Sequence, residues 1–349
     1  MYIFAVHNRV QIENALAVTK HLPSASFKFF QSANGVMSDS PPETQRHIPG
    51  HSAKNVLRLI RTQSFTRSDV VIVPQDLGLA WRATAETARR RGSLLALMPD
   101  GIVSSLPVLR GGITKRLGRT IATSPLVAAG LLSRSSGIMG GSDPNLILRW
   151  GSAWSQSFES SDNAIDVGCP RMDQLAQIGP RPDNLKLLVC SQPMHLSSWT
   201  RPFAAEWYAF LLKLIQHSTD PTSLRVRLHP AENPDRLPSP LRDAIAPPRS
   251  LRDDIEWASV VAAPFSTVLL EASVAGRAAI QLPRNRPMHA MATGYPFFTD
   301  PEVTQCSWDQ HALLELARTA TPLNNIDRFA AFVGESGKRV ALALQQLAQ

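Results

Sequence analysis

The sequence predicts an α/β protein with two Rossmann-like domains, each built on a parallel β-sheet. Short apolar runs such as 70–73 and 260–263, typical of strands buried on both faces, alternate with segments of helical period. The alternation comes in two series, separated by the Gly- and Pro-rich stretch 179–184, and 349 residues exceed one typical core. We therefore expect an N-terminal domain over 1–175, a C-terminal domain over 185–325 and a C-terminal helix over 326–349.

The first series is read from continuous apolar runs for strands and from spaced apolar positions for helices. The expected strands cover 2–6, 27–30, 69–74, 94–98 and 146–148. The expected helices cover 10–21, 53–62 and 79–91, and a Pro-rich loop covers 38–49. Gly92 directly follows the last of these helices, which is ordinary C-terminal capping chemistry.

The second series repeats the pattern. The expected strands cover 185–190, 224–228, 260–263 and 278–282. The expected helices cover 204–217, 251–257, 308–320 and 326–349, with a further helix that follows Thr267 and breaks at Gly276. The stretch 236–248 is polar and Pro-rich, and no element is predicted there.

The net charge of +8 is placed unevenly along the chain. Residues 1–170 hold 18 basic and 11 acidic residues, and the stretch 102–142 holds five basic residues, among them Arg110, Lys115 and Arg116, and no acidic one. This stretch is either a solvated basic face or a contact for an anionic polymer or phospholipid surface. It contains no Phe, Tyr or Trp for base stacking, so we do not expect nucleic-acid binding.

Several other classes of protein are disfavoured by the sequence. Neither series has a G-x-G-x-x-G or a G-x-x-x-x-G-K-[ST] pattern, which argues against dinucleotide oxidoreductases and P-loop NTPases. The three cysteines are widely spaced, and no paired Cys or H-E-x-x-H motif indicates a metal site. No signal peptide and no apolar run of membrane-spanning length is visible, so we expect a cytoplasmic protein. From the missing motifs we expect neither a metal nor a bound cofactor.

Two polar turns follow strands of the second series. His229 and Pro230 end the strand 224–228, and Ser266 and Thr267 end the strand 260–263 just before a helix. Polar groups at the carboxyl ends of neighbouring parallel strands can line one crevice and hold an anion such as a phosphate. Taken alone, His229 is more often a structural histidine, and Ser266 and Thr267 are ordinary N-cap residues.

A carboxylate in the first series could act as a general base. Asp100 follows the strand 94–98 and precedes Gly101, and a half-buried carboxylate there can have a raised pKa. The alternative is an ordinary turn Asp before Gly. His7, which ends the first strand beside Asn8, is a rival base. Glu271, one helical turn after Thr267, could reach a ribose or be a solvent-exposed helix acid.

In this order, the Asp-Gly, His-Pro and Ser-Thr pairs resemble motifs of the bacterial sialyltransferase and polysialyltransferase families, which are GT-B glycosyltransferases. The second half also resembles the capsule and teichoic-acid group, which includes Kdo transferases and CDP-glycerol glycerophosphotransferases. The segment 168–173 is similar to their G-x-P-R-x-D segment, and 264–268 to their D-Y-S-S-x segment. Pro99 stands where the sialyltransferase motif has a second acid, and Pro264 and Phe265 replace the Asp-Tyr pair of the teichoic-acid group.

The resemblance implies two parallel sheets facing a central cleft and a role for each matching residue. It implies that Asp100 is the general base and that His229 contacts the nucleotide phosphate, with protonation of the leaving group as a further role. The resemblance implies donor binding by Gly168, Arg171, His229, Ser266 and Thr267, and we add Ser191, Gln192, Pro230 and Glu271 to the expected donor-binding set. On the acceptor side we expect His7, Asn8, Gly101, Arg110, Lys115 and Arg116, of which the resemblance covers only Gly101.

We expect an inverting, metal-independent glycosyltransferase of bacterial surface-glycan biosynthesis, such as capsule or lipopolysaccharide. Its donor would be a nucleotide sugar, with CMP-linked sialic-acid-like sugars or Kdo favoured. Its acceptor would be an anionic glycan or a lipid-linked acceptor, met at the inner membrane face through the basic stretch 102–142. The alternatives are transfer from CDP-glycerol or a UDP- or dTDP-sugar, a UDP-sugar 2-epimerase activity, and a non-catalytic binding protein or inactive partner subunit.

Overall fold

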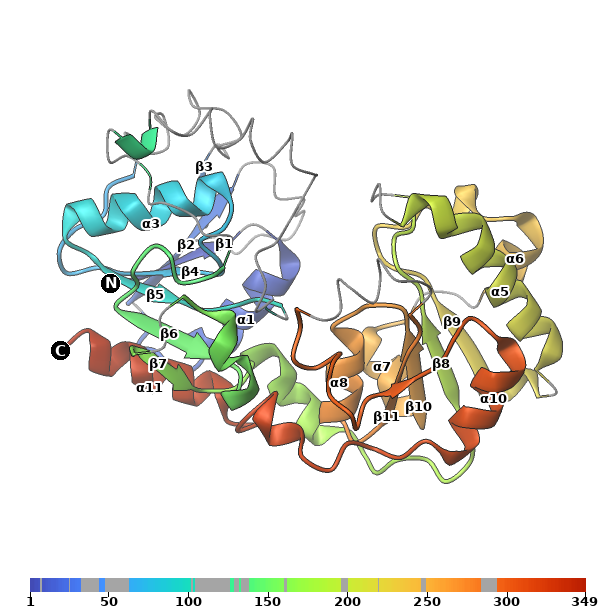
Figure 1. The fold of residues 1–349 in the computed structure, drawn as a ribbon. Helices are drawn as coiled ribbons and strands as arrows, with labels where there is room; N and C mark the ends of the chain where they lie inside the picture. The colour runs from blue at the N-terminus through green and yellow to red at the C-terminus, as the bar shows by residue number, and fades with distance from the viewer. Residues whose placement is uncertain are drawn as a thin grey trace. The chain divides into compact units, whose positions relative to one another are not determined.

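A computed structural model of the chain describes residues 1–6, 8–24, 26–32, 44–47, 63–101, 103, 126–128, 132, 138–159, 162–195, 200–218, 220–245, 249–283 and 294–349. The chain forms two compact units (Figure 1). Unit 1 consists of Met1–Asp173 together with Asp327–Gln349, and unit 2 of Gln174–Ile326. Each unit has its own parallel sheet with helices packed against it, which confirms the predicted α/β fold class.

The sheet of unit 1 has seven strands in the order β3-β2-β1-β4-β5-β6-β7, and every neighbouring pair is parallel. The strands are β1 (Tyr2–Val6), β2 (Phe27–Ser32), β3 (Thr44–His47), β4 (Val70–Val73), β5 (Leu94–Leu97), β6 (Leu146–Arg149) and β7 (Ala164–Asp166). β1 and β4 are buried along their whole length, as their continuous apolar sequences predict. Because β2 and β4 lie on opposite sides of β1, the sheet has a topological switch point between β1 and β4.

The helices of unit 1 include one that comes from the far end of the sequence. The elements are α1 (Arg9–Thr19), α3 (Leu79–Arg91), α11 (Ser336–Leu347) and the 3-10 segment η1 (Ser152–Ser157), while η2 (Pro170–Gln177) and η6 (Ile326–Arg328) contain the two unit boundaries. α11 packs against α1 (Figure 1). Its residues Val340, Ala341 and Leu344 share one apolar core with Phe4 and Ile12. Unit 1 is therefore completed by a segment that follows unit 2 in the sequence.

The sheet of unit 2 has five parallel strands in the order β12-β11-β10-β8-β9. The strands are β8 (Leu187–Cys190), β9 (Leu224–Arg227), β10 (Val260–Ala263), β11 (Ala278–Gln281) and β12 (Thr304–Gln305). The helices are α5 (Ala204–His217), α6 (Ser239–Ala244), α7 (Leu251–Trp257), α8 (Val268–Val274) and α10 (Gln310–Thr319), with 3-10 turns η3 (Arg201–Phe203), η4 (Pro221–Ser223) and η5 (Pro234–Arg236). α5 buries Trp207, Phe210 and Leu214 in the core.

Two expectations about elements are wrong, and one helix was not expected. The Pro-rich stretch 38–49 contains the strand β3. β3 pairs on one side only, with β2, and its polar sequence lacks the apolar pattern from which a strand is predicted. The stretch 236–248 contains α6, which has Pro at its amino end, where proline is tolerated. The last helix begins at Ser336 and not at 326, because Phe332 and Gly334 have positive φ and interrupt the helical path. The helix expected over 53–62 lies outside the described residues.

One arginine in unit 2 is buried like a core residue. Arg277 is 1% exposed and joins three backbone segments. Its Nε donates to the carbonyl of Ile255 at 3.1 Å, and its two terminal nitrogens donate to the carbonyls of Gly179, Ala275 and Glu256 at 2.8–3.2 Å. A planar guanidinium can satisfy several fixed acceptors at once, so Arg277 ties the 179 segment and the end of α7 to the turn before β11.

The segment 168–173 packs against the C-terminal part of unit 1. The carboxylate of Asp173 accepts hydrogen bonds from the backbone N–H groups of Gly334, Ser336 and Gly337 at 2.8–3.0 Å, where α11 begins. A carboxylate at a helix N-terminus satisfies free N–H groups and complements the helix dipole. Gly168 has a φ of +85°, and a Cβ there would overlap the carbonyl oxygen of Ala331. This segment therefore holds α11 in place.

Candidate functional site

The polar turns of unit 2 meet at a topological switch point of its sheet. β8 is the first strand of the unit, and its neighbours β9 and β10 lie on opposite sides of it. In open α/β sheets, ligands bind outside the carboxyl ends of the strands at such a point. Ser191 follows β8, His229 follows β9 and Ser266 follows β10, so three predicted donor-binding turns lie at this edge of one sheet.

The turns after β8 and β10 are joined by a direct hydrogen bond. The Gln192 side-chain amide donates from Nε2 to the backbone carbonyl of Phe265. Ser191 is buried, its N–H donates to the carbonyl of Arg227 at 2.8 Å, and its Oγ accepts from the indole N–H of Trp207 at 3.0 Å. The structure thus brings Ser191 and Gln192 next to the β10 turn, and their role in donor binding stays a prediction.

The Ser-Thr turn is half-buried at the start of α8. The hydroxyl of Ser266 accepts the backbone N–H of Val268 at 3.3 Å, while the Thr267 side chain makes no capping hydrogen bond. Because α8 has only seven residues, its helix dipole is weak. The two hydroxyls would therefore contribute more than the dipole to the binding of an anion at this turn. Glu271 is buried, so the reading of Glu271 as a solvent-exposed acid is wrong. Its proposed contact with a ribose stays a prediction.

His229 is half-buried and is fixed by its own turn. Its Nδ1 accepts the backbone N–H of Ala231 at 3.1 Å, and its carbonyl accepts the N–H of Glu232 at 2.8 Å. Burial lowers the pKa of His229 below its usual value, so the neutral imidazole is favoured at pH 7. Pro230, next to it, is exposed.

Behind this turn lies a group of residues that the sequence analysis missed. Glu232 is 8% exposed and accepts the hydroxyl of Tyr208, from α5, at 2.5 Å. Burial raises the pKa of Glu232, and the hydroxyls of Tyr208 and Ser191 and the nearby His195 only partly offset this effect. Tyr208 lies on the apolar face of α5, and a buried tyrosine hydroxyl needs a hydrogen-bond partner. A tyrosine at this position of the predicted helix therefore indicated a buried polar partner, although not which residue it is.

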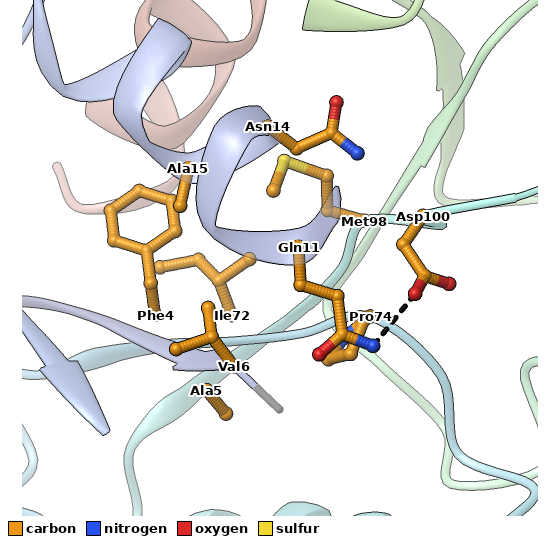
Figure 2. A pocket seen from close by; sticks show the side chains of 10 residues that line it. All are labelled: Phe4, Ala5, Val6, Gln11, Asn14, Ala15, Ile72, Pro74, Met98 and Asp100. Carbon is orange, nitrogen blue, oxygen red and sulfur yellow. Dashed lines mark hydrogen bonds between the residues drawn. The ribbon is translucent and has the colours of Figure 1, made fainter. Parts of the chain in front are cut away.

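In unit 1, Asp100 follows β5 and meets the first turn of α1. Gln11 donates from Nε2 to Oδ2 of Asp100 at 2.7 Å (Figure 2). Asn8 donates from Nδ2 to the same oxygen at 3.5 Å. Asn8 also caps α1, because its Oδ1 accepts the N–H of Gln11 at 2.9 Å. Asn8 was predicted on the acceptor side and lies beside Asp100, whereas Gln11 was missed.

A small cavity adjoins Asp100 at the β1–β4 switch point. Its volume is about 10 Å³, room for roughly one water-sized group. Figure 2 shows its lining, which comes from β1, α1 and β4 and from the segments that follow β4 and β5: Phe4, Ala5, Val6, Gln11, Asn14, Ala15, Ile72, Pro74, Met98 and Asp100. A group of hydroxyl size could therefore bind within reach of the Asp100 carboxylate.

The remaining predicted residues fall in three groups. His7, Arg110, Lys115 and Arg116 lie outside the described residues, as does most of the basic stretch 102–142. Gly101 is a half-buried turn residue beside Asp100. Gly168 packs against the segment before α11, and the N–H of Arg171 donates to Oδ1 of Asn14 at 3.0 Å, so both have packing roles within unit 1. A role for either in donor binding stays a prediction.

Two negative findings concern the described part of the chain. Among these residues, no group of three His, Cys, Asp or Glu side chains is arranged to hold a metal ion. Within the same residues, no helix combines the length and the apolar character that crossing a membrane requires.

The chain is similar to known proteins in its fold but not in its sequence. No family model and no curated protein sequence matches it. A variant of the wall teichoic acid polymerase TagF is similar with a TM-score of 0.61 and 10% identity, over 99% of this chain and 89% of that one. UDP-GlcNAc 2-epimerase from Methanocaldococcus jannaschii gives a TM-score of 0.59 and 11% identity, over 99% and 100% of the two chains.

A third solved structure is similar to the chain to the same degree. A putative UDP-N-acetylglucosamine 2-epimerase from Listeria monocytogenes gives a TM-score of 0.60 at 10% identity, over 99% of this chain and 96% of that one. At these identities the likeness establishes the fold, and this fold is of the GT-B type, with two Rossmann-like units.

Proposed function

We propose that the chain is an inverting, metal-independent glycosyltransferase that uses a nucleotide-activated donor bound by unit 2. The observation that carries this proposal is the meeting of the β8 and β10 turns at the switch point, joined by the Gln192–Phe265 hydrogen bond. Hydroxyls and an imidazole at this edge suit a phosphate, because fixed donors stabilise the charge that develops on a departing nucleotide. The GT-B type of fold supports the same class of substrate.

The donor we favour is a CMP-linked acidic sugar, either sialic-acid-like or Kdo, on the strength of the Asp-Gly, His-Pro and Ser-Thr motifs. A second candidate is CDP-glycerol, supported by the likeness to TagF, which has also been solved with CDPG. A third is a UDP-sugar, supported by the likeness to the 2-epimerases. The acceptor would be an anionic glycan or a glycolipid, and no cofactor is needed beyond the donor itself.

On the acceptor side, Asp100 would remove the proton from the attacking hydroxyl. Its Oδ2 is held by Gln11, so the carboxylate has a fixed position beside a cavity of hydroxyl size. A general base must lie within hydrogen-bond reach of the proton that it takes, and this arrangement provides such a place. The acceptor oxygen then attacks the anomeric carbon opposite the departing phosphate, which inverts that centre.

The first experiment is a thermal shift assay with CMP, CDP, UDP and dTDP. A ligand that binds only the folded chain stabilises it by about 2.7 kcal/mol at a hundred times its Kd, which is a readily measured shift. We expect the cytidine nucleotides to give the largest shift. A shift with UDP alone would replace the cytidine donor with a UDP-sugar, and no shift with any nucleotide would overturn the proposed function.

Ser266→Ala should weaken nucleotide binding by about tenfold to a hundredfold, because one hydrogen bond to a charged phosphate contributes roughly 1.5–3 kcal/mol. Isothermal titration with the nucleotide that gives the largest shift measures this effect. Ser223→Ala is the matched control, since Ser223 lies at the opposite, amino edge of the same sheet and should bind like the wild type. Equal affinity of the two variants would remove Ser266 from the site.

Asp100→Asn should lower kcat by at least about a hundredfold and leave donor affinity unchanged, because the base acts only in the transition state. Initial rates of nucleotide release in the presence of acceptor, together with titration of the nucleotide, separate the two effects. Asp143→Asn is the control, since Asp143 is an exposed residue of unit 1. If Asp100→Asn weakened nucleotide binding instead, Asp100 would belong to the donor pocket.

A further inference from the structure

The His-Pro turn fixes not only where His229 lies but also which of its ring nitrogens carries the proton. We propose that His229 is a neutral imidazole with its proton on Nε2, and that it contacts the donor phosphate as a hydrogen-bond donor and not as an acid. We further assign Glu232 and Tyr208 as the positioning residues that hold the turn in this state. The phosphate contact rests on the proposed function, whereas the tautomer does not.

The tautomer follows from one hydrogen bond. The backbone N–H of Ala231 points at Nδ1 of His229 at 3.1 Å. A backbone N–H can only donate, so Nδ1 must offer its lone pair and cannot carry a proton. In a neutral imidazole the proton is then on Nε2, which presents an N–H donor on the other side of the ring.

The turn that aims this N–H is braced from within unit 2. The N–H of Glu232 donates to the His229 carbonyl at 2.8 Å and closes the turn around Ala231. The Glu232 side chain is buried, and the hydroxyl of Tyr208, itself 3% exposed, donates to its Oε1 at 2.5 Å. Because α5 carries Tyr208, the helix fixes Glu232 and, through it, the position of the Ala231 N–H.

The charged surroundings do not favour an imidazolium. In the described part of the chain, the titratable groups beside the turn include Glu232 on the turn itself, Tyr208 on α5 and His195 after β8. Oε1 of Glu232 accepts the Tyr208 hydroxyl, and Nδ1 of His229 accepts the Ala231 N–H, so neither contact requires an imidazolium. Arg227, at the end of β9, is paired with Asp254 at 2.6 Å. Burial itself lowers the pKa of His229.

The chemistry balances without a proton from His229. The proton of the acceptor hydroxyl goes to Asp100, the new bond forms between the acceptor oxygen and the anomeric carbon, and the bond from that carbon to the phosphate oxygen breaks. The nucleotide leaves with the electron pair as an anion. A neutral N–H donor stabilises the developing charge on this anion, and its ring stays in one protonation state throughout the step.

The tautomer can be read directly in the full-length protein without any ligand. Nitrogen-15 NMR of ring-labelled histidine distinguishes an Nε2–H imidazole, an Nδ1–H imidazole and an imidazolium. The chain has nine histidines, and His229→Gln assigns the signal by removing it. We expect the Nε2–H pattern at pH 7 and above. An Nδ1–H or imidazolium pattern at pH 7 would overturn the inference.

Two variants test the role in binding. His229→Gln keeps an amide N–H near the position of Nε2, whereas His229→Asn places its amide near Nδ1. With CMP, CDP and UDP as probes, we expect Gln to retain the wild-type affinity within about threefold and Asn to lose about tenfold to a hundredfold. If Gln bound nucleotide normally but lost more than a hundredfold in kcat, His229 would be an acid. If the wild type bound none of the three nucleotides, the proposed function would fail while the tautomer result stood.

The positioning residues are tested by the same spectrum. Tyr208→Phe removes the hydroxyl that holds Glu232, so we expect the single Nε2–H pattern of His229 to become a mixture of tautomers. Glu232→Gln keeps a carbonyl oxygen that can accept the Tyr208 hydroxyl, so the wild-type pattern should persist. An unchanged pattern in folded Tyr208→Phe protein would show that the backbone turn alone fixes the tautomer and would remove Tyr208 from the assignment.

Discussion

Gly168→Ala should lower the free energy of unfolding of unit 1 by about 2–5 kcal/mol. The φ of +85° costs an alanine roughly 1–2 kcal/mol. The new Cβ would also overlap the Ala331 carbonyl and the Ser336 side chain, and overpacking of this kind costs about 1–3 kcal/mol more. Because a backbone atom is involved, the clash is relieved only by moving the segment that leads into α11.

The matched control is Gly276→Ala, which has a φ of +70° but no atom within 4 Å of the added Cβ. It should show the conformational cost alone, roughly 1–2 kcal/mol. Urea unfolding gives the two free energies, and hydrogen exchange of peptides from 327–349 shows whether α11 loosens in Gly168→Ala only. Equal costs for the two variants would mean that close packing at Gly168 contributes nothing.

Arg277→Met should lower the free energy of unfolding of unit 2 by about 3–5 kcal/mol. Methionine matches the length of the arginine stem but leaves the carbonyls of Gly179, Ile255, Ala275 and Glu256 without their donor. Each buried carbonyl left without a partner costs about 1–3 kcal/mol, although water can reach those that are partly exposed. The loss therefore lies below the simple sum of four such terms.

Arg277→Lys and Arg9→Met complete this test. Lysine keeps the charge but cannot span all four acceptors, so its cost should fall between those of wild type and Arg277→Met. Arg9 forms an exposed pair with Glu13, and Arg9→Met should change stability by less than about 0.5 kcal/mol. If Arg277→Met cost no more than Arg9→Met, the four hydrogen bonds would add nothing to the stability of unit 2.

Much of the fold could be predicted from local signals. The helices expected over 79–91, 204–217 and 251–257 coincide with α3, α5 and α7, since each has spaced apolar positions and a recognisable end. The strand expected over 260–263 coincides with β10, which is buried along its whole length. β3 was missed because an edge strand with the sequence Thr-Gln-Arg-His carries no apolar pattern, and only its pairing with β2 reveals it.

The candidate site was predictable only in part, for a related reason. Polar residues that directly follow a predicted strand indicate a polar turn, and Ser191, His229 and Ser266 were predicted in this way. The contacts that organise those turns depend on which strands are neighbours and which helix lies behind them. Gln192 meets Phe265 across 73 positions, Tyr208 meets Glu232 across 24, and Gln11 meets Asp100 across 89. No local pattern encodes such pairs.

The return of α11 to unit 1 has a consequence for synthesis on the ribosome. Unit 2 is one continuous stretch, whereas unit 1 needs Met1–Asp173 and also Asp327–Gln349. Domains generally fold as they emerge, at about 5–20 residues per second, so unit 1 waits about 10–35 s for its last segment. During that time the apolar surface around Phe4 and Ile12 lacks the cover of Val340 and Leu344. This apolar surface of the nascent first unit therefore stays uncovered until α11 docks.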